Sequence, residues 1–450
     1  KHQFVFLYRR DSMYDVIFSK GNVVFKDEIK QCDVAVKDGK IVAIASQLEG
    51  ALTTIHLDGQ YLFPGGIDVH VHLNEPGNAH WEGFETGTQL LAAGGITTFF
   101  DMPLNANPPT IHVEALQMKE KLAEEKAIIH PYYWGGLVHN NVNQLAALAE
   151  AGVIGFKAFL SNSGFEPFSS VQNESLFNGM QEIARLEKIL ALHAESDELT
   201  TFLQQQKIQE GATTAQDYSA SRPILAEVEA VKRALYYAEL TGCALHFVHI
   251  SSAEAVACIQ NAKKQGLDVS LETCPHYLLF NDTAYEQHGV LAKCAPPLRA
   301  IGEQQALIEC LLNDEIDMIA SDHSPCPPEM KDLSNKHFFQ AWGGINGGQF
   351  TLLALLEICQ SYHVPFYKIA RWLSENPAKR FGLENKGKIE VGYDADFAVV
   401  SKRPFTVTKA VSYAKHKDSI YEGVAFSHSV IATYVQGKCV FHTEVLENQY

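Results

Sequence analysis

The chain lacks several features that define whole classes of protein. It has no run of about 18 uncharged apolar residues, so the sequence predicts no transmembrane helix. Its nine cysteines are an odd number without paired spacing, and no Cys-x-x-Cys pair suggests a zinc ribbon. Such cysteines are typical of reduced thiols rather than of a disulfide framework, so we expect a cytoplasmic protein.

Positive charge is also scarce. Lys and Arg number 36 against 53 Asp and Glu, which gives a net charge of −17. A surface of this sign repels phosphate, so we expect neither nucleic acid nor an anionic membrane as a partner. The 450 residues, 46% hydrophobic and 20% charged, are typical of a packed protein with one large domain and a smaller one.

Both ends of the chain are rich in short β patterns. Residues 14–19 and 33–44 predict strands, with a hairpin turn at Asp38-Gly39, and residues 396–400 and 430–441 show the same pattern. Each end is too small for a good core of its own. We therefore predict one small β-sandwich built from residues 13–63 and 386–450. Residues 1–12, an upstream extension or an expression remnant, are expected to lie outside it.

Between these ends, residues 64–385 alternate between helix and strand patterns at βα spacing. Residues 223–240 predict a helix, because apolar residues recur along one face and Pro223 and Gly242 suit its two ends. Seven apolar strands are visible, and one more would close a (β/α)8 barrel. Periodicity alone does not distinguish this barrel from an open doubly wound sheet.

Two histidines, His70 and His72, stand at the end of the first of these strands. Residues i and i+2 of a strand face the same side, so both imidazoles converge on one point. Imidazole is the commonest side-chain metal ligand. An ordinary pair of strand histidines is the alternative.

Further polar residues end the later strands, where a parallel barrel has its active-site face. Lys157 lies in an apolar strand, where burial favours the neutral amine that can form a carbamate with carbon dioxide, unless the amine reaches solvent. His193 and His249 are metal ligands or satisfied core histidines, and His246 fits a structural role. Asp322 is a metal ligand and proton shuttle, or a cap or loop aspartate.

The chain from about residue 14 onward resembles the cyclic amidohydrolases of the amidohydrolase superfamily. The segments that carry the resemblance are residues 66–73, 94–98, 248–252, 274–277, 322–325, 376–383 and 387–396. Residues 80–88, 324–331 and 341–345 resemble the allantoinase branch in particular. The resemblance implies an α/β fold, with a (β/α)8 TIM-like barrel and a small β-sandwich from both chain ends.

It also implies a binuclear metal centre. One divalent ion would be held by His70, His72 and Asp322, and the second by His193 and His249. Lys157, modified to N6-carboxylysine, would bridge them. Zinc is the expected metal, although cobalt, iron or manganese suit the same ligands. A bridging hydroxide would attack a ring carbonyl, and Asp322 would pass its proton to the departing ring nitrogen, opening allantoin to allantoate.

Substrate contacts are expected from Asn74, His276, Ala295 and Gly343. Asn74 replaces an arginine of dihydroorotase-like relatives, which favours an uncharged ureido or amide group over a carboxylate. His323 and Glu82 support the site or are purely structural. The alternatives are a hydantoinase or dihydropyrimidinase and a non-catalytic scaffold of the same fold. A homotetramer is expected from the resemblance.

Overall fold

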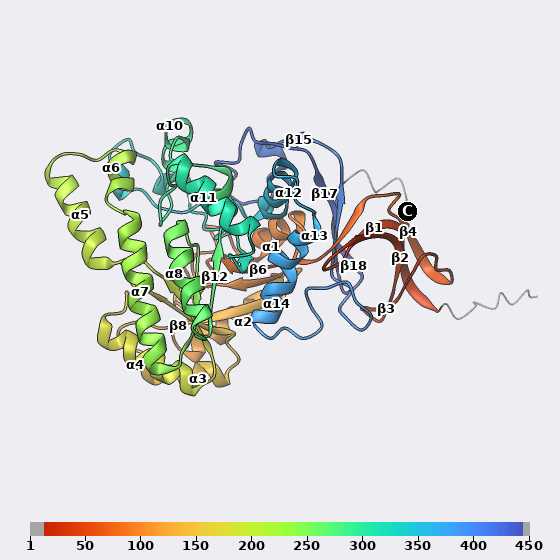
Figure 1. The fold of residues 1–450 in the computed structure, drawn as a ribbon, viewed down its shortest axis with the longest axis horizontal. Coiled ribbons are helices and arrows are strands. Elements are labelled where there is room, and N and C mark those ends of the chain that lie inside the picture. Colours follow the sequence, from red (N-terminus) through yellow and green to blue (C-terminus); the bar gives the residue numbers. More distant parts are fainter. Residues whose placement is uncertain (1–12, 444–450) are drawn as a thin grey trace, which may run out of the picture.

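The computed structural model describes residues 13–443, and the predicted leader at residues 1–12 lies outside this range. Eight parallel strands pair with one another in the order of the sequence. They lie in the larger part of the molecule, where β6, β8 and β12 are labelled in Figure 1. They are β6 (Gly66–Val71), β7 (Ile96–Asp101), β8 (His130–Gly136), β9 (Gly155–Phe159), β10 (Ile189–His193), β11 (Ala244–Phe247), β12 (Val269–Thr273) and β13 (Met318–Ile319). The α/β barrel prediction is therefore confirmed, and the eighth strand is β8.

The barrel closes between its last and first strands by a short seam. The strand β13 has only two residues, and its continuation meets β6 through a parallel bridge between Val71 and His323. The His72 amide donates to the His323 carbonyl at 2.8 Å, and the Ser321 amide donates to the Asp68 carboxylate at 3.0 Å. These bonds bring residues about 250 positions apart into contact at the carboxyl ends of the strands.

Helices cover the outside of the barrel. The principal ones are α1 (Phe84–Ala93), α2 (Val113–Lys126), α3 (Leu145–Glu150), α4 (Asn173–Arg185), α7 (Ile224–Thr241), α8 (Ala253–Lys264), α11 (Ile301–Leu312) and α12 (Thr351–Ser361). The predicted helix at 223–240 is α7: Val231 faces the core, Pro223 precedes the first turn, and Gly242 ends the helix with φ of 71°. Further helices lie in the connections between these elements, namely α5 (Asp197–Gln209), α6 (Ala215–Ala220), α9 (Pro275–Leu279), α10 (Ala284–His288), α13 (Tyr367–Ala370) and α14 (Asn376–Arg380).

A second sheet is built from both chain ends, as predicted. Its order is β18-β17-β14-β5-β1-β2-β3, with β4 paired to β1. The bounds are β1 (Tyr14–Val24), β2 (Ile29–Lys37), β3 (Lys40–Ala45), β4 (Ala51–His56), β5 (Tyr61–Pro64), β14 (Phe397–Ser401), β17 (Ser429–Val435) and β18 (Lys438–His442), and a separate ribbon joins β15 (Phe405–Thr406) to β16 (Ala425–Phe426). Asp38-Gly39 makes the predicted turn, with both residues at positive φ.

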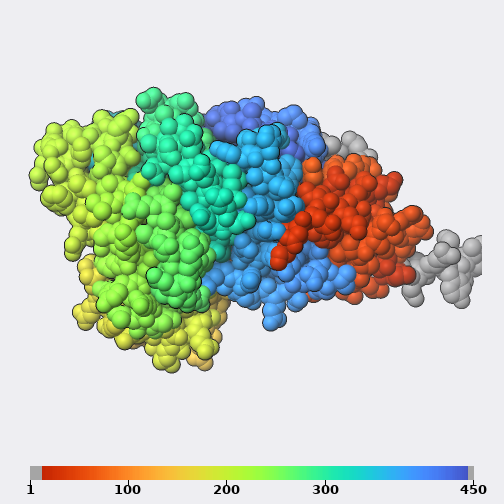
Figure 2. All heavy atoms as spheres, in the orientation of Figure 1, coloured from red at the N-terminus to blue at the C-terminus, as the bar shows by residue number. Residues whose placement is uncertain are grey.

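This sheet has a core of its own. Phe18, Val34, Leu62 and Phe397, from the two ends of the chain, are buried in one apolar cluster. In Figure 2 the first and last parts of the chain accordingly adjoin at one end of the molecule.

The sheet is tied closely to the barrel, since only Gly65 separates β5 from β6. A Cβ at Gly65 would lie 2.1 Å from the Thr97 hydroxyl oxygen, so only glycine fits there. The Thr433 hydroxyl of β17 also donates to the Ala92 carbonyl of α1 at 2.6 Å. Among residues 13–443, no helix has the length and apolarity to cross a membrane.

A buried ion pair fixes the loop that follows the first barrel strand. Lys119 of α2, fully buried, donates to Asp101 Oδ2 at 2.5 Å and to the Met102 carbonyl at 2.9 Å. The other oxygen of Asp101 accepts the Leu73 amide at 2.8 Å. The loop next to His72 therefore depends on a carboxylate that Lys119 neutralises.

We expect Lys119→Met to lower the free energy of unfolding by about 3–5 kcal/mol, because it leaves the Asp101 carboxylate buried without a counter-ion. Denaturant unfolding measures this change. Lys121→Met, at an exposed position of the same helix, is the control and should change stability by less than about 0.5 kcal/mol. Equal stabilities for the two variants would contradict the assignment.

Candidate metal centre

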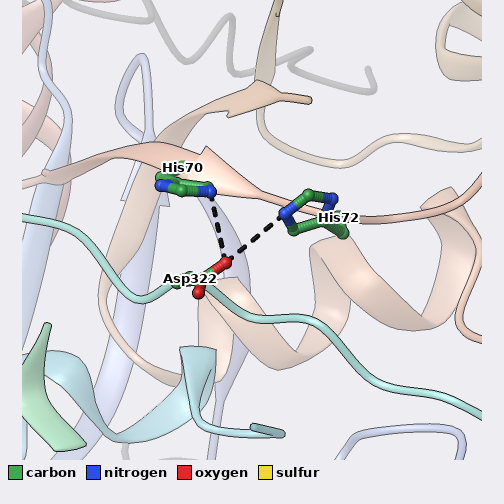
Figure 3. A group of neighbouring side chains, drawn as sticks. All are labelled: His70, His72 and Asp322. Carbon is green, nitrogen blue, oxygen red and sulfur yellow. Dashed lines mark ion pairs between the residues drawn. The ribbon is translucent and has the colours of Figure 1, made fainter. Parts of the chain in front are cut away.

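Three predicted ligands meet at the seam of the barrel. His70 and His72 come from the end of β6, and Asp322 comes from the segment after β13 (Figure 3). Asp322 Oδ1 lies 3.2 Å from His70 Nε2 and 3.4 Å from His72 Nε2. Two ligand atoms on one zinc ion, each about 2.0–2.1 Å from it, are separated by roughly 3.0–3.4 Å. The spacing of the three side chains therefore fits a shared divalent cation.

A carboxylate on the far side of His70 sets the direction of its ring. Glu272, at the end of β12, lies 2.6 Å from His70 Nδ1 and 3.0 Å from His246 Nε2. Burial opposes ionisation of Glu272, but His70 and His246 outweigh it and hold the carboxyl pKa at about 2. An ionised Glu272 accepts the Nδ1 proton and leaves the Nε2 lone pair of His70 free for a metal. His246 is bound to Glu272 and Ser270, in keeping with a structural role.

His72 has a weaker partner in Asn105, whose amide lies 3.3 Å from His72 Nδ1. The side-chain oxygen of Asn105 is buried and has no hydrogen-bond partner among the described residues. Turning the amide by 180° directs this oxygen at Nδ1, which then donates its proton and leaves Nε2 free. Asn105 thus fits the role for His72 that Glu272 has for His70.

The second pair of histidines lies beside the first group. His193, at the end of β10, and His249, just beyond β11, point at each other with 2.9 Å between Nδ1 and Nε2. His193 Nε2 lies 2.7 Å from Glu195, which also bonds to Arg222. The rings of His70 and His249 are 5.4 Å apart, so the two groups share one site.

Burial keeps these histidines neutral. It lowers the pKa of His72 and His193 and places that of His249 well below the ordinary value. A neutral imidazole retains the lone pair that a metal needs. The opposite holds for Asp322: burial alone would raise its pKa, but His70, His72 and His249 hold the pKa below its ordinary range, so the carboxylate is ionised.

Lys157, in the middle of β9, is fully buried, and its Nζ has no hydrogen-bond partner among the described residues. It lies 4.9 Å from the centre of the Phe159 ring. Burial lowers the pKa of Lys157 to about 7, although Glu272 and Asp322 pull the other way. The amine does not reach solvent, so the snorkelling alternative is wrong for this side chain. An unpartnered buried nitrogen is costly and indicates a missing bonding group.

A cavity of about 80 Å³ opens on both groups of ligands. The candidate substrate contacts Ala295 and Gly343 line it, whereas Asn74 and His276 are absent from its walls. Asn74 and His276 are nevertheless buried, and none of their side-chain nitrogen or oxygen atoms has a partner in the described structure. Polar groups that sequence reasoning missed complete the wall: Asn105, Asn162, Ser163 and Ser324.

Glu272 and Glu195 were also absent from the sequence-based site. Both could have been found by the rule that identified the histidines, because Glu272 lies at the carboxyl end of β12 and Glu195 lies two residues beyond β10. His323 and Glu82, which the sequence left undecided, lie 3.3 Å apart and fully buried behind the seam. His323 also forms the backbone bridge to Val71, which fits the structural interpretation.

Comparison with known proteins defines the class of protein. The amidohydrolase family profile matches residues 61–440, and the chain belongs to this family. A family of this kind implies a divalent metal, and His70, His72 and Asp322 form a group that could hold one.

Particular relatives narrow the comparison. An allantoinase from Bacillus velezensis is 52% identical over 429 residues, covering 95% of this chain and 94% of the relative. An allantoinase from Deinococcus radiodurans is 44% identical, with 95% of each chain covered. Among solved structures, the L-hydantoinase (dihydropyrimidinase) from Arthrobacter aurescens superposes with a TM-score of 0.92 at 32% identity, with 96% of each chain covered.

We expect Glu272→Gln to weaken zinc binding about 10–100-fold, because an amide cannot accept a proton from both His70 and His246. Calorimetric titration of zinc into metal-free protein measures the change. Glu239→Gln, on the exposed face of α7, is the matched control. Unchanged zinc affinity in the Glu272 variant would show that this carboxylate does not orient His70.

Proposed function

We propose that this chain hydrolyses the ring amide of allantoin and releases allantoate. The observation that carries the proposal is the convergence of His70, His72, Asp322, His193 and His249 on one small cavity, in a chain 52% identical to an allantoinase. A scaffold without activity has no need of these ligands, and every expected position is filled. The protein is therefore a hydrolase of cyclic amides.

The proposed metal centre contains two divalent ions, with zinc the first choice. His70, His72 and Asp322 would hold one ion, and His193 and His249 the other. Bound metal supplies a water of lowered pKa and a polarised carbonyl. The convergence of neutral imidazoles and one ionised carboxylate supports this arrangement.

Lys157 is proposed to carry the N6-carboxyl group. A neutral ε-amine attacks the carbon of carbon dioxide, forms a C–N bond and releases one proton, which gives an anionic carbamate. The lowered pKa of about 7 supplies the neutral amine at physiological pH. No acceptor among the described residues hydrogen-bonds to Nζ, so the amine is free to react. The modification turns an isolated nitrogen into a pair of oxygen ligands.

Asp322 is proposed as the proton shuttle. Its Oδ1 lies against His70 and His72, which leaves Oδ2 to take a proton from the nucleophile and deliver it to the departing ring nitrogen. The position of Asp322 in the cavity wall supports this role.

The shape and polarity of the cavity favour an uncharged ring. Its lining contains no arginine or lysine and instead presents Asn105, Asn162 and Ser163. A carboxylate-bearing dihydropyrimidine would find no arginine or lysine side chain in this lining to bind its carboxylate. Asn74, His276, Ala295 and Gly343 remain the proposed contacts, and the unpartnered atoms of Asn74 and His276 are the support for the first two.

The second candidate is a hydantoinase or dihydropyrimidinase, because the superposed solved structures carry those names. We also infer a cytoplasmic homotetramer. The exposed apolar side chains of Leu225, Tyr236 and Leu240 on α7 are in keeping with contact between subunits.

Turnover of allantoin, hydantoin and dihydrouracil by the zinc-loaded protein tests the function. We expect kcat/KM for allantoin to exceed the other two by at least about tenfold, since the polar wall suits its ureido group. A higher value for hydantoin or dihydrouracil would favour the second candidate. No turnover of any ring by protein with bound metal would support a scaffold.

We expect Asp322→Asn to lower kcat for ring opening by about 10²–10⁴-fold, because an amide cannot accept the proton. Asp332→Asn, an exposed change ten residues along the same segment, should retain normal activity. Zinc content is measured alongside the rate. A normal rate in the Asp322 variant would overturn the proton-shuttle role.

A further inference from the structure

One wall of the cavity is an irregular segment, residues 338–344. Its start is a short turn of 3-10 helix (Phe338–Gln340), and its end supplies Trp342, Gly343 and Gly344 to the cavity. No strand of the described structure pairs with it. The carbonyl groups of such a segment need other donors if its position is to be fixed.

Lys293 supplies one set of donors. Its side chain is buried, with 4% exposed, and Nζ donates to the carbonyls of Phe338 at 2.9 Å, Phe339 at 3.0 Å and Ala341 at 2.6 Å. The three protons of the ammonium group are therefore all used. The Lys293 carbonyl also accepts the Gly344 amide at 2.8 Å, so both side chain and backbone hold the segment.

Lys331 supplies the second set. Its Nζ donates to the carbonyls of Gly344 at 2.8 Å, Val290 at 3.2 Å and Trp342 at 3.4 Å. Within residues 13–443, neither Lys293 nor Lys331 forms a salt bridge with an acidic side chain. Both ammonium groups are satisfied by backbone carbonyls, and five of these carbonyls belong to residues 338–344.

The two lysines flank one residue, Gly343, whose own backbone N–H and carbonyl are free. Gly343 is exposed in the cavity, and neither its N–H nor its carbonyl has a hydrogen-bond partner among the described residues. The residues before and after it are fixed by Lys293 and Lys331. Gly344 is confined as well, because a Cβ there would lie 2.3 Å from the Ser324 carbonyl oxygen.

We propose that Lys293 and Lys331 are positioning residues, which hold the free Gly343 peptide where it hydrogen-bonds the ring amide of the substrate. This proposal rests on the proposed ring-opening function. Burial lowers the pKa of Lys293 to about 7 and that of Lys331 to about 8, and the protonated form of each amine supplies one N–H to each of the three carbonyls around it. The buried surroundings strengthen these hydrogen bonds. Without the hydrogen bonds from Lys293 and Lys331, residues 338–344 are no longer held in place, and the backbone groups of Gly343 move away from the position that binds the ring.

Lys293→Met and Lys331→Met test the proposal. Methionine keeps an unbranched, apolar stem but donates no hydrogen bond. Lys368→Met is the matched control, because Lys368 Nζ also donates to a backbone carbonyl, that of Leu312 at 2.9 Å, yet lies outside the cavity wall. The readouts are kcat and KM for ring opening, zinc affinity and the melting temperature.

We expect KM to rise about tenfold in each cavity-wall variant, with kcat changed less than about threefold and zinc affinity unchanged. A misplaced binding group weakens substrate and transition state alike, which raises KM. Lys331→Arg, which keeps a cationic donor, should recover most of the loss. In the control Lys368→Met we expect unchanged kcat, KM and zinc affinity, and at most a lower melting temperature.

An unchanged KM in both methionine variants would overturn the proposal, as would a KM rise of the same size in Lys368→Met. If Lys293→Met does not fold, the test rests on Lys331→Met and Lys331→Arg, because Lys331 is only half-buried. The wild-type protein is assayed first on all three rings, and KM is measured with whichever ring it opens. Failure of the allantoin proposal is thereby separated from failure of the positioning role.

Discussion

The seam between β13 and β6 is the contact on which the site depends. Six candidate ligands come from five separate parts of the chain, and only barrel closure brings the last of them, Asp322, against His70 and His72. The seam is short: the Val71–His323 bridge, the His72 amide bond and the Asp68–Ser321 bond carry it. Asp322 and His249 both adopt positive φ at the strand ends, a costly conformation that the surrounding bonds hold in place.

Burial then gives each ligand the protonation state that a metal requires. It lowers the pKa of His72, His193, His249 and Lys157, so their nitrogens keep lone pairs. The carboxylates stay ionised despite the same burial, because cations or histidine N–H groups face them. Burial would raise the pKa of Glu195, but Arg222 and His193 hold it at about 2. One physical effect therefore prepares neutral nitrogen ligands, while local pairing preserves the acceptors that orient them.

Most of the architecture was predictable because its signals are local. Helix α7 has a complete apolar stripe and two clear ends, and the Asp38-Gly39 turn needs positive φ at adjacent residues. Strand β8 was not predicted, because Pro131 and the pair Gly135-Gly136 are residues that rarely occur in strands, although the residues between them are aromatic. The carboxylates Glu272 and Glu195 were missed because a glutamate near a strand end does not identify its own partners. Glu272 faces His70 and His246 from two other strands, and Glu195 joins the nearby His193 to the more distant Arg222. The domain limits at residues 63/64 and 385/386 and the individual ligand roles stay predictions.

A crystal structure of the zinc-loaded protein, with anomalous diffraction recorded at the zinc edge, tests the central claim most directly. The account predicts two zinc peaks per chain, one between His70, His72 and Asp322 and one at His193 and His249, with extra density for a carboxyl group on Lys157 Nζ between them. Zinc bound elsewhere, or a bare Lys157 amine beside two occupied sites, would contradict it.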